Sequence, residues 1–272
     1  MQRTTPHTPL TSKDNTVIKK LRSLSDPRQR RKESSFLIEG VKMVEEALRD
    51  KAGVQTVVAS PALVQHHGKG ILKLAEHEHV EVLWISDRLM DSLAENKTPQ
   101  PVLAVVGMRN YGEDELFSRS SNLIVIAHRL QDPGNLGTII RTAEAVSASG
   151  VAYTADTVDP YNAKAVRASM GSILRVPVVF VDGIKAFLAA CGRKGYQTAA
   201  TSLSGTTTHF DVDFTRPTVV VLGREGAGLP RDLTDCIDVS LRIPMADTID
   251  SLNVATAAAV ILYEALRQRL GK

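Results

Sequence analysis

Three segments of the chain place glycines and polar side chains directly after apolar stretches, where the binding sites of α/β proteins gather. The first, residues 132–145 (DPGNLGTIIRTAEA), predicts a turn at Asn135 and then a helix that carries Arg141. A guanidinium is permanently charged and binds a phosphate or a carboxylate with two parallel hydrogen bonds. The spacing of these residues by itself, however, favours the simpler interpretation that Arg141 is an ordinary arginine on the surface of a helix.

The second segment, residues 219–230 (VVVLGREGAGLP), runs from four apolar residues into Gly223, Glu225 and Gly228. Glycines at the end of a strand let the backbone approach a ligand closely. The spacing is neither G-x-G-x-x-G nor a P-loop, and the Glu225 carboxylate would oppose a phosphate. The loop therefore suits a ligand with cationic or hydroxyl groups, and the alternative is a tight turn between a strand and a helix.

The third segment, residues 242–269, continues from a strand ending at Met245 through a polar loop into an Ala-rich helix. Ser251 is a favourable N-cap residue, and we predict that it caps a helix over 252–270. The pattern is typical of a buried C-terminal helix, and its small residues also suit a homodimer interface.

Alternating strands and helices must position these segments. Residues 36–40 predict a strand and residues 41–51 an amphipathic helix, and this rhythm repeats as far as a polar stretch at 109–121. Beyond it the alternation resumes, with a helix expected at 134–147. Such an order predicts two α/β units with parallel or mixed sheets.

Composition limits the class of protein. Of the 272 residues 43% are hydrophobic and 23% charged, which is typical of a soluble globular protein. The N-terminus lacks the apolar core of a signal peptide, and no stretch is long enough for a membrane span. Cys191 and Cys236 form neither a zinc pattern nor a disulfide framework. We therefore expect a cytoplasmic protein with no membrane partner and no metal.

The charge is unevenly distributed. Residues 1–110 carry 17 Lys and Arg against 13 Asp and Glu, whereas residues 111–272 carry 16 against 17. Most of the excess lies in residues 13–32, and such a cluster can neutralise phosphates. The alternative is a solvated helix and a polar loop. The candidate nucleic-acid-binding side chains are Lys19, Lys20, Arg22, Arg28, Arg30, Arg31 and Lys32.

In this order and spacing, the three segments resemble the signature motifs of the SpoU/TrmH branch of the SPOUT RNA methyltransferases. The matching residues are Asn135, Gly137, Arg141 and Thr142; then Leu222, Gly223, Glu225 and Gly228; then Ile243, Pro244, Met245, Ser251, Leu252, Asn253 and Val254. The resemblance covers roughly residues 121–270. The N-terminal part resembles the L30e-like RNA-binding domain that many such enzymes carry.

The resemblance implies a domain order and a fold. The expected ranges are a disordered leader at 1–12, an L30e-like α/β domain at 13–110, a linker at 111–120 and a SPOUT domain at 121–272. The SPOUT domain would be an α/β sheet with a deep trefoil knot. The family works as a homodimer in which each active site borrows from the neighbouring subunit.

The resemblance also implies transfer of a methyl group from S-adenosylmethionine to a ribose 2′-hydroxyl of RNA. The donor would be held by Thr201, Leu222, Gly223, Ile243, Met245 and Leu252, and the catalytic residues would be Asn135, Arg141, Glu225, Ser251 and Asn253. The pKa of an arginine exceeds about 12, so we expect Arg141 to stabilise the developing alkoxide and grip the adjacent phosphate. The proton of the hydroxyl would leave to phosphate or water.

One residue departs from the family pattern, because Asp247 stands where the third motif usually has glycine. Ribosomal RNA is the first choice of substrate and transfer RNA the second. A non-catalytic RNA-binding protein of this fold is a further alternative, although Asn135, Arg141 and Asn253 are all present. The absence of G-x-G-x-x-G argues against a Rossmann-type nucleotide enzyme.

Overall fold

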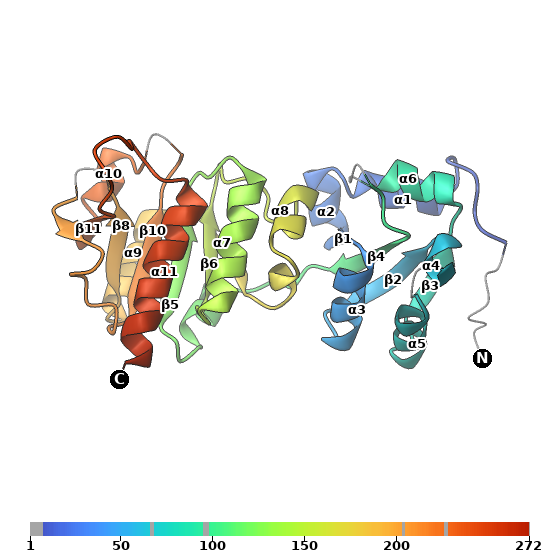
Figure 1. Ribbon diagram of the computed structural model, residues 1–272, viewed down its shortest axis with the longest axis horizontal. Coiled ribbons are helices and arrows are strands. Elements are labelled where there is room, and N and C mark those ends of the chain that lie inside the picture. The colour runs from blue at the N-terminus through green and yellow to red at the C-terminus, as the bar shows by residue number, and fades with distance from the viewer. Residues whose placement is uncertain (1–7, 66–67, 95–97, 203–204, 226–227, 272) are drawn as a thin grey trace. The chain divides into compact units, whose positions relative to one another are not determined.

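The chain folds into two compact units, which we describe separately (Figure 1). The computed structural model describes residues 8–65, 68–94, 98–202, 205–225 and 228–271. The N-terminal unit contains the described residues up to Arg109 together with Tyr161–Leu174, and the C-terminal unit contains Asn110–Pro160 and the described residues from Arg175 onward. Within the described ranges, every helix is too short or too polar to cross a bilayer.

The N-terminal unit is a four-stranded sheet of order β1-β4-β2-β3, with antiparallel pairs around β4 and a parallel pair β2–β3. Its elements are α1 (Thr16–Ser23), α2 (Pro27–Glu33), β1 (Ser35–Glu39), α3 (Val41–Arg49), β2 (Val54–Ala59), α4 (Ala62–Gln65), α5 (Lys69–His77), β3 (Glu81–Trp84), α6 (Asp87–Leu93), β4 (Val102–Gly107) and α8 (Ala163–Ala168), followed by a 3₁₀ turn at Ser172–Leu174. Helix α3 buries Val44, Ala47 and Leu48. The amphipathic helix expected at 41–51 is therefore confirmed.

Two features of this unit differ from the sequence-based expectation. The leader expected at 1–12 is ordered at Leu10, whose backbone exchanges hydrogen bonds with Trp84 and Ser86 beside β3; residues 1–7 lie outside the described residues. The segment Tyr161–Leu174 was expected within the C-terminal domain but packs with the N-terminal unit. Its Tyr161 ring lies 4.8 Å from that of Phe36. Neither contact has a local sequence signal, because both partners are distant in the chain.

The C-terminal unit is a seven-stranded parallel sheet of order β7-β6-β5-β10-β8-β11-β9. Its elements are η1 (Glu113–Phe117), β5 (Leu123–Ala127), α7 (Pro133–Ala145), β6 (Gly150–Thr154), β7 (Val178–Val181), α9 (Ile184–Arg193), β8 (Gln197–Thr201), β9 (Thr207–Thr208), β10 (Thr218–Leu222), α10 (Arg231–Thr234), β11 (Val239–Arg242) and α11 (Val254–Leu270). Strands β5 and β10 are buried along their whole length, because helices cover both faces of the sheet.

One layer of helices covers each face of this sheet. Helices α7 and α11 lie side by side on one face (Figure 1), and α9 and α10 pack into a core cluster on the other. Leu116 of η1 is buried in that same cluster, so residues 111–120 are not an extended linker. Strand β10 lies between β5 and β8, and the deep knot itself stays an expectation from the resemblance.

Candidate active site

The carboxyl ends of the central parallel strands bring the three motif segments to one edge of the sheet. Ala127 at the end of β5 is in register with Leu222 at the end of β10, and the His128 N–H donates to the Leu222 carbonyl at 2.9 Å. Strand β8 pairs with β10, and β11 pairs with β8. Because all four strands are parallel, the segments that follow them emerge together.

A chain of side-chain hydrogen bonds joins the three segments. The Asn135 Nδ2 donates to Glu225 Oε1 at 2.9 Å, and the Asn253 Nδ2 donates to Asn135 Oδ1 at 2.9 Å. These contacts connect residues 90 and 118 positions apart in the chain. Glu225 therefore helps to fix the orientation of the Asn135 side chain.

Helix caps fix both asparagines. The Asp132 carboxylate caps α7 by accepting from the Asn135 N–H at 2.9 Å, and Pro133 at the first helical position has no N–H that needs a partner. The Asn253 Oδ1 caps α11 by accepting from the Ala255 and Thr256 N–H groups. The prediction that Ser251 caps this helix is wrong, because the helix begins later and Ser251 is exposed.

Hydrogen bonding keeps Glu225 ionised. Burial raises the pKa of its carboxyl, but the Asn135 amide and the backbone N–H groups of Gln131 and Asp132 outweigh burial, and the pKa lies below its ordinary value. The Gln131 N–H donates to Glu225 Oε2 at 3.2 Å. The carboxylate thus accepts from both the β5–α7 turn and α7.

Replacing Glu225 by glutamine tests this charge. A depressed pKa stabilises the fold above the unfolded-state value of about 4.3, and the gain is lost as the pH falls through the folded-state pKa. We expect Glu225→Gln to lower the unfolding free energy by on the order of 1 kcal/mol at pH 7, allowing for partial exposure. Urea titrations should show the difference from wild type shrinking as the pH falls below the unfolded-state value and disappearing below the folded-state pKa. Equal stabilities at pH 7 would contradict the assignment.

Glycines shape the loops beside this network. A Cβ at Gly223 would lie 2.6 Å from the carbonyl carbon of Gly228 and 2.8 Å from the Leu229 nitrogen. Gly228 has φ +66°, and its N–H donates to the Arg224 carbonyl at 2.8 Å. A Cβ at Gly205, after β8, would lie 2.8 Å from the Leu241 backbone. Gly205 was not anticipated, because an isolated glycine in a polar stretch has no distinctive spacing.

The third motif offers polar backbone groups at the same edge. Ile243, Met245 and Leu252 are partly buried, and within the described chain their backbone N–H and C=O groups have no hydrogen-bond partner. Such groups fit the ammonium, carboxylate, hydroxyl and adenine groups of S-adenosylmethionine, and partly buried Thr201 ends the neighbouring strand β8. Leu222 does not fit the expected donor contact, because its side chain is in the core and its carbonyl binds His128.

Arg141 lies apart from the network within one chain. It is exposed on α7, and six residues of helix place it about 9 Å along the axis and about 120° around it from Asn135. None of the described residues forms a hydrogen bond or ion pair with its guanidinium. Asp247 and Ser251 are likewise exposed.

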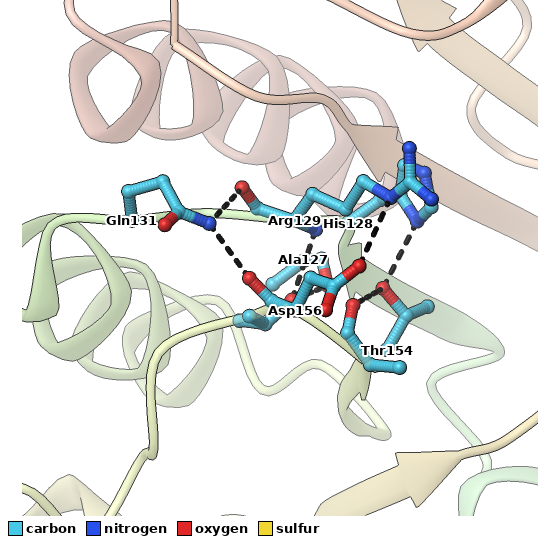
Figure 2. Close-up of polar contacts among 8 residues, drawn as sticks. Ala127, His128, Arg129, Gln131, Thr154 and Asp156 are labelled. Atoms are coloured by element: carbon cyan, nitrogen blue, oxygen red, sulfur yellow. Dashed lines mark hydrogen bonds and ion pairs between the residues drawn. The ribbon is translucent and has the colours of Figure 1, made fainter.

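Sequence reasoning missed Gln131. Its side-chain Nε2 donates to the carbonyl oxygens of Arg129 at 3.0 Å and Asp156 at 2.7 Å, which ties the β5–α7 turn to the end of β6 (Figure 2). No spacing rule identifies a glutamine in a turn. Across the described ranges, no three His, Cys, Asp or Glu side chains form a group suited to a metal ion.

The N-terminal basic residues divide into two sets. Arg30 is buried, and its guanidinium donates to the Leu24 and Ser25 carbonyls at 2.8 Å. This burial corrects the expectation that Arg30 binds RNA. Three of the others have partners within the unit: Lys19 pairs with Asp14, Lys20 with Glu33, and Arg22 with Ser92. The exposed cations of α2 are Arg28, Arg31 and Lys32.

Comparison with known proteins agrees with this geometry. Residues 122–263 match the SpoU rRNA Methylase family, and residues 15–104 match the MRM3-like substrate binding domain. The 23S rRNA (uridine(2479)-2′-O)-methyltransferase of Streptomyces viridochromogenes is 33% identical over 253 residues, 91% of this chain and 88% of that protein. The 23S rRNA (guanosine(2553)-2′-O)-methyltransferase RlmP of Bacillus subtilis is 31% identical over 258 residues, 93% and 96% of the two chains.

A solved structure gives the same result. The SpoU methyltransferase AviRb from Streptomyces viridochromogenes, in complex with the cofactor AdoMet, is similar with a TM-score of 0.84 and 32% identity, covering 94% of this chain and 98% of that one. The family match spans more than half of the 272 residues, and relatives above 30% identity extend along most of the chain. The chain therefore belongs to the SpoU rRNA methylase family.

Proposed function

We propose that this protein transfers a methyl group from S-adenosylmethionine to a ribose 2′-hydroxyl of ribosomal RNA. The observation that carries the proposal is the Glu225–Asn135–Asn253 chain of side-chain hydrogen bonds, which joins the three motif segments at one sheet edge. Two relatives with this activity and the AdoMet-bound neighbour support it. We also propose that the protein is cytoplasmic.

Each group has a defined task in this reaction. When bound, the donor would supply an electrophilic methyl on a positively charged sulfur and leave as a neutral thioether, while the 2′-hydroxyl proton passes to phosphate or water. Gly223, Ile243 and Leu252 hold it through backbone groups, while Asn135 and Asn253 orient the ribose. Arg141 stabilises the developing alkoxide and binds the adjacent phosphate. Alignment of the two reactants supplies much of the rate, because it replaces a bimolecular encounter.

A second copy of the chain completes the site in this proposal. Thr138, Arg141 and Ala145 form one exposed stripe along α7. Helix α11, which packs beside α7, exposes 53% of Tyr263. A homodimer formed through these helices would bring the Arg141 of one subunit to the donor-binding loops of its partner.

The family does not fix the target nucleotide. The two 23S rRNA relatives are named for a uridine and a guanosine. We take ribosomal RNA as the substrate class, with transfer RNA as the second candidate. Tritiated-methyl transfer to purified rRNA and tRNA, followed by mapping of methylated riboses, tests both. RNA binding without any transfer would identify a non-catalytic binder instead.

The exposed cations of α2 are proposed to bind RNA. Replacing Arg28, Arg31 and Lys32 together by alanine should weaken RNA binding at least about tenfold at 0.1 M salt and reduce the salt slope by about 2 to 3. Filter binding at several salt concentrations measures both. Arg30→Ala is the contrasting variant, because its hydrogen bonds are internal and it should lower thermal stability. An unchanged salt slope in the triple variant would reject the surface.

A further inference from the structure

Arg129 occupies an unusual backbone conformation beside the active site. It is the second residue after β5, and its φ of +57° lies in the left-handed region that non-glycine residues rarely adopt. Three contacts fix this turn: the Arg129 N–H donates to Thr157 Oγ1 at 2.9 Å, Thr157 Oγ1 donates to the Ala127 carbonyl at 3.1 Å, and Gln131 Nε2 donates to the Arg129 carbonyl at 3.0 Å (Figure 2). Strain retained in this way is typical of functional positions.

The backbone of Arg129 is fixed, but its guanidinium is held only weakly. In Figure 2 the Arg129 side chain extends away from Gln131 and past Asp156. Its Nε lies 3.7 Å from Asp156 Oδ2, and the two side chains are 51% and 72% exposed. An exposed ion pair of this length is weak and screened by salt. A phosphate that offers two oxygens to the guanidinium can therefore replace Asp156.

The charged groups near Arg129 favour the binding of an anion there. The carboxylate of Asp232, on α10, is already paired with Lys185 at 2.8 Å. Ala127 on β5 is in register with Leu222 on β10. Arg129 and Arg224 each follow two residues later, so they occupy matching positions beyond the two adjacent strands. Arg224 is exposed. Two arginines thus leave adjacent strands at the edge where the motif segments meet.

The order of strands places Arg129 and Asp156 to one side of the donor-binding loops. Those loops follow β10, β8 and β11, whereas Arg129 and Asp156 follow β5 and β6, on the side of β10 away from β8 and β11. An anion at Arg129 therefore belongs to the RNA rather than to the carboxylate of the methyl donor. We propose that Arg129 binds a backbone phosphate of the RNA substrate and that Asp156 holds its guanidinium until the RNA binds. This inference rests on the proposed function and adds a substrate contact to it.

Variants at the two positions should have opposite effects on RNA binding. Arg129→Gln should weaken binding of a 23S rRNA transcript about tenfold and reduce the salt slope by about 1. Asp156→Asn should strengthen binding about two- to fivefold, because it removes the competing carboxylate. Asparagine tolerates the left-handed backbone of Asp156, which has φ +64°. If the Arg129–Asp156 ion pair only stabilised the fold, both variants would lose that ion pair, and RNA affinity would change in the same direction in both.

The matched control is Arg193→Gln, which removes an equal charge from the last turn of α9, at the opposite edge of the sheet. Filter binding over a salt series measures RNA affinity, and calorimetry with S-adenosylmethionine should give the wild-type Kd for all three variants. The inference is overturned if Arg129→Gln binds the transcript like wild type, if both variants weaken binding alike, or if Arg129→Gln impairs donor binding. Failure of the proposed function would appear separately, as a wild-type protein that transfers no methyl to rRNA.

Discussion

Replacing Arg141 by alanine is expected to reduce methyl transfer to RNA by about 10³-fold, the range found when a group that stabilises transition-state charge is removed. Arg141 is exposed and forms no hydrogen bond or ion pair with a described residue, so its loss should leave the fold and the donor loops unchanged. Single-turnover transfer of a tritiated methyl group measures the rate. Calorimetry should show that the Kd for S-adenosylmethionine stays within about twofold of wild type, since binding and chemistry are separate steps. Transfer at the wild-type rate would remove Arg141 from the mechanism.

Mixed dimers show from which subunit Arg141 acts. Arg141→Ala keeps an intact donor site, and a variant with a damaged donor site keeps an intact Arg141. If Arg141 serves the partner's site, a heterodimer of the two contains one complete site, and a random mixture recovers about a quarter of wild-type activity. If Arg141 serves its own subunit, the mixture stays inactive. That second result would contradict the proposed arrangement.

The second large effect is expected from Gly223→Ala. The added Cβ would lie 2.6 Å and 2.7 Å from the carbonyl atoms of Gly228 and 2.8 Å from the Leu229 nitrogen. Each neighbour is backbone, so the loop must move, whereas a flexible side chain would rotate away. We expect the Kd for S-adenosylmethionine to rise about 100-fold, or about 2.7 kcal/mol. Calorimetry measures the loss directly, and this variant is the donor-site partner for the mixed dimers.

Gly112→Ala is the control for this substitution. Gly112 has a φ of −82°, and a Cβ there would meet nothing within 4 Å. Its donor affinity should equal that of wild type. Gly223→Ala should still unfold cooperatively on heating. Thermal unfolding of both variants therefore separates loss of the donor site from loss of the fold. Unchanged donor binding in Gly223→Ala would show that this turn does not shape the donor site.

Hydrogen bonds of individual side chains account for what the sequence did not predict. Asn253 rather than Ser251 caps α11, because the same side chain also donates to Asn135. Arg30 is buried because two carbonyls of the preceding loop accept from its guanidinium. Gln131 acts through the carbonyls of Arg129 and Asp156. Local propensity contains no information about such partners.

The sequence by itself determined the α/β class, the helix at α7, the strands before each motif and the polar groups that follow them. These features depend on residues a few positions apart, since burial of one helix face or of a whole strand leaves a periodic pattern. Only the tertiary structure decided which polar groups meet, because parallel pairing of β5, β10, β8 and β11 brings their carboxyl ends to one edge. It also left Arg141 on an exposed helix face, away from the Glu225–Asn135–Asn253 hydrogen bonds, because six residues of helix turn the side chains of Asn135 and Arg141 in different directions.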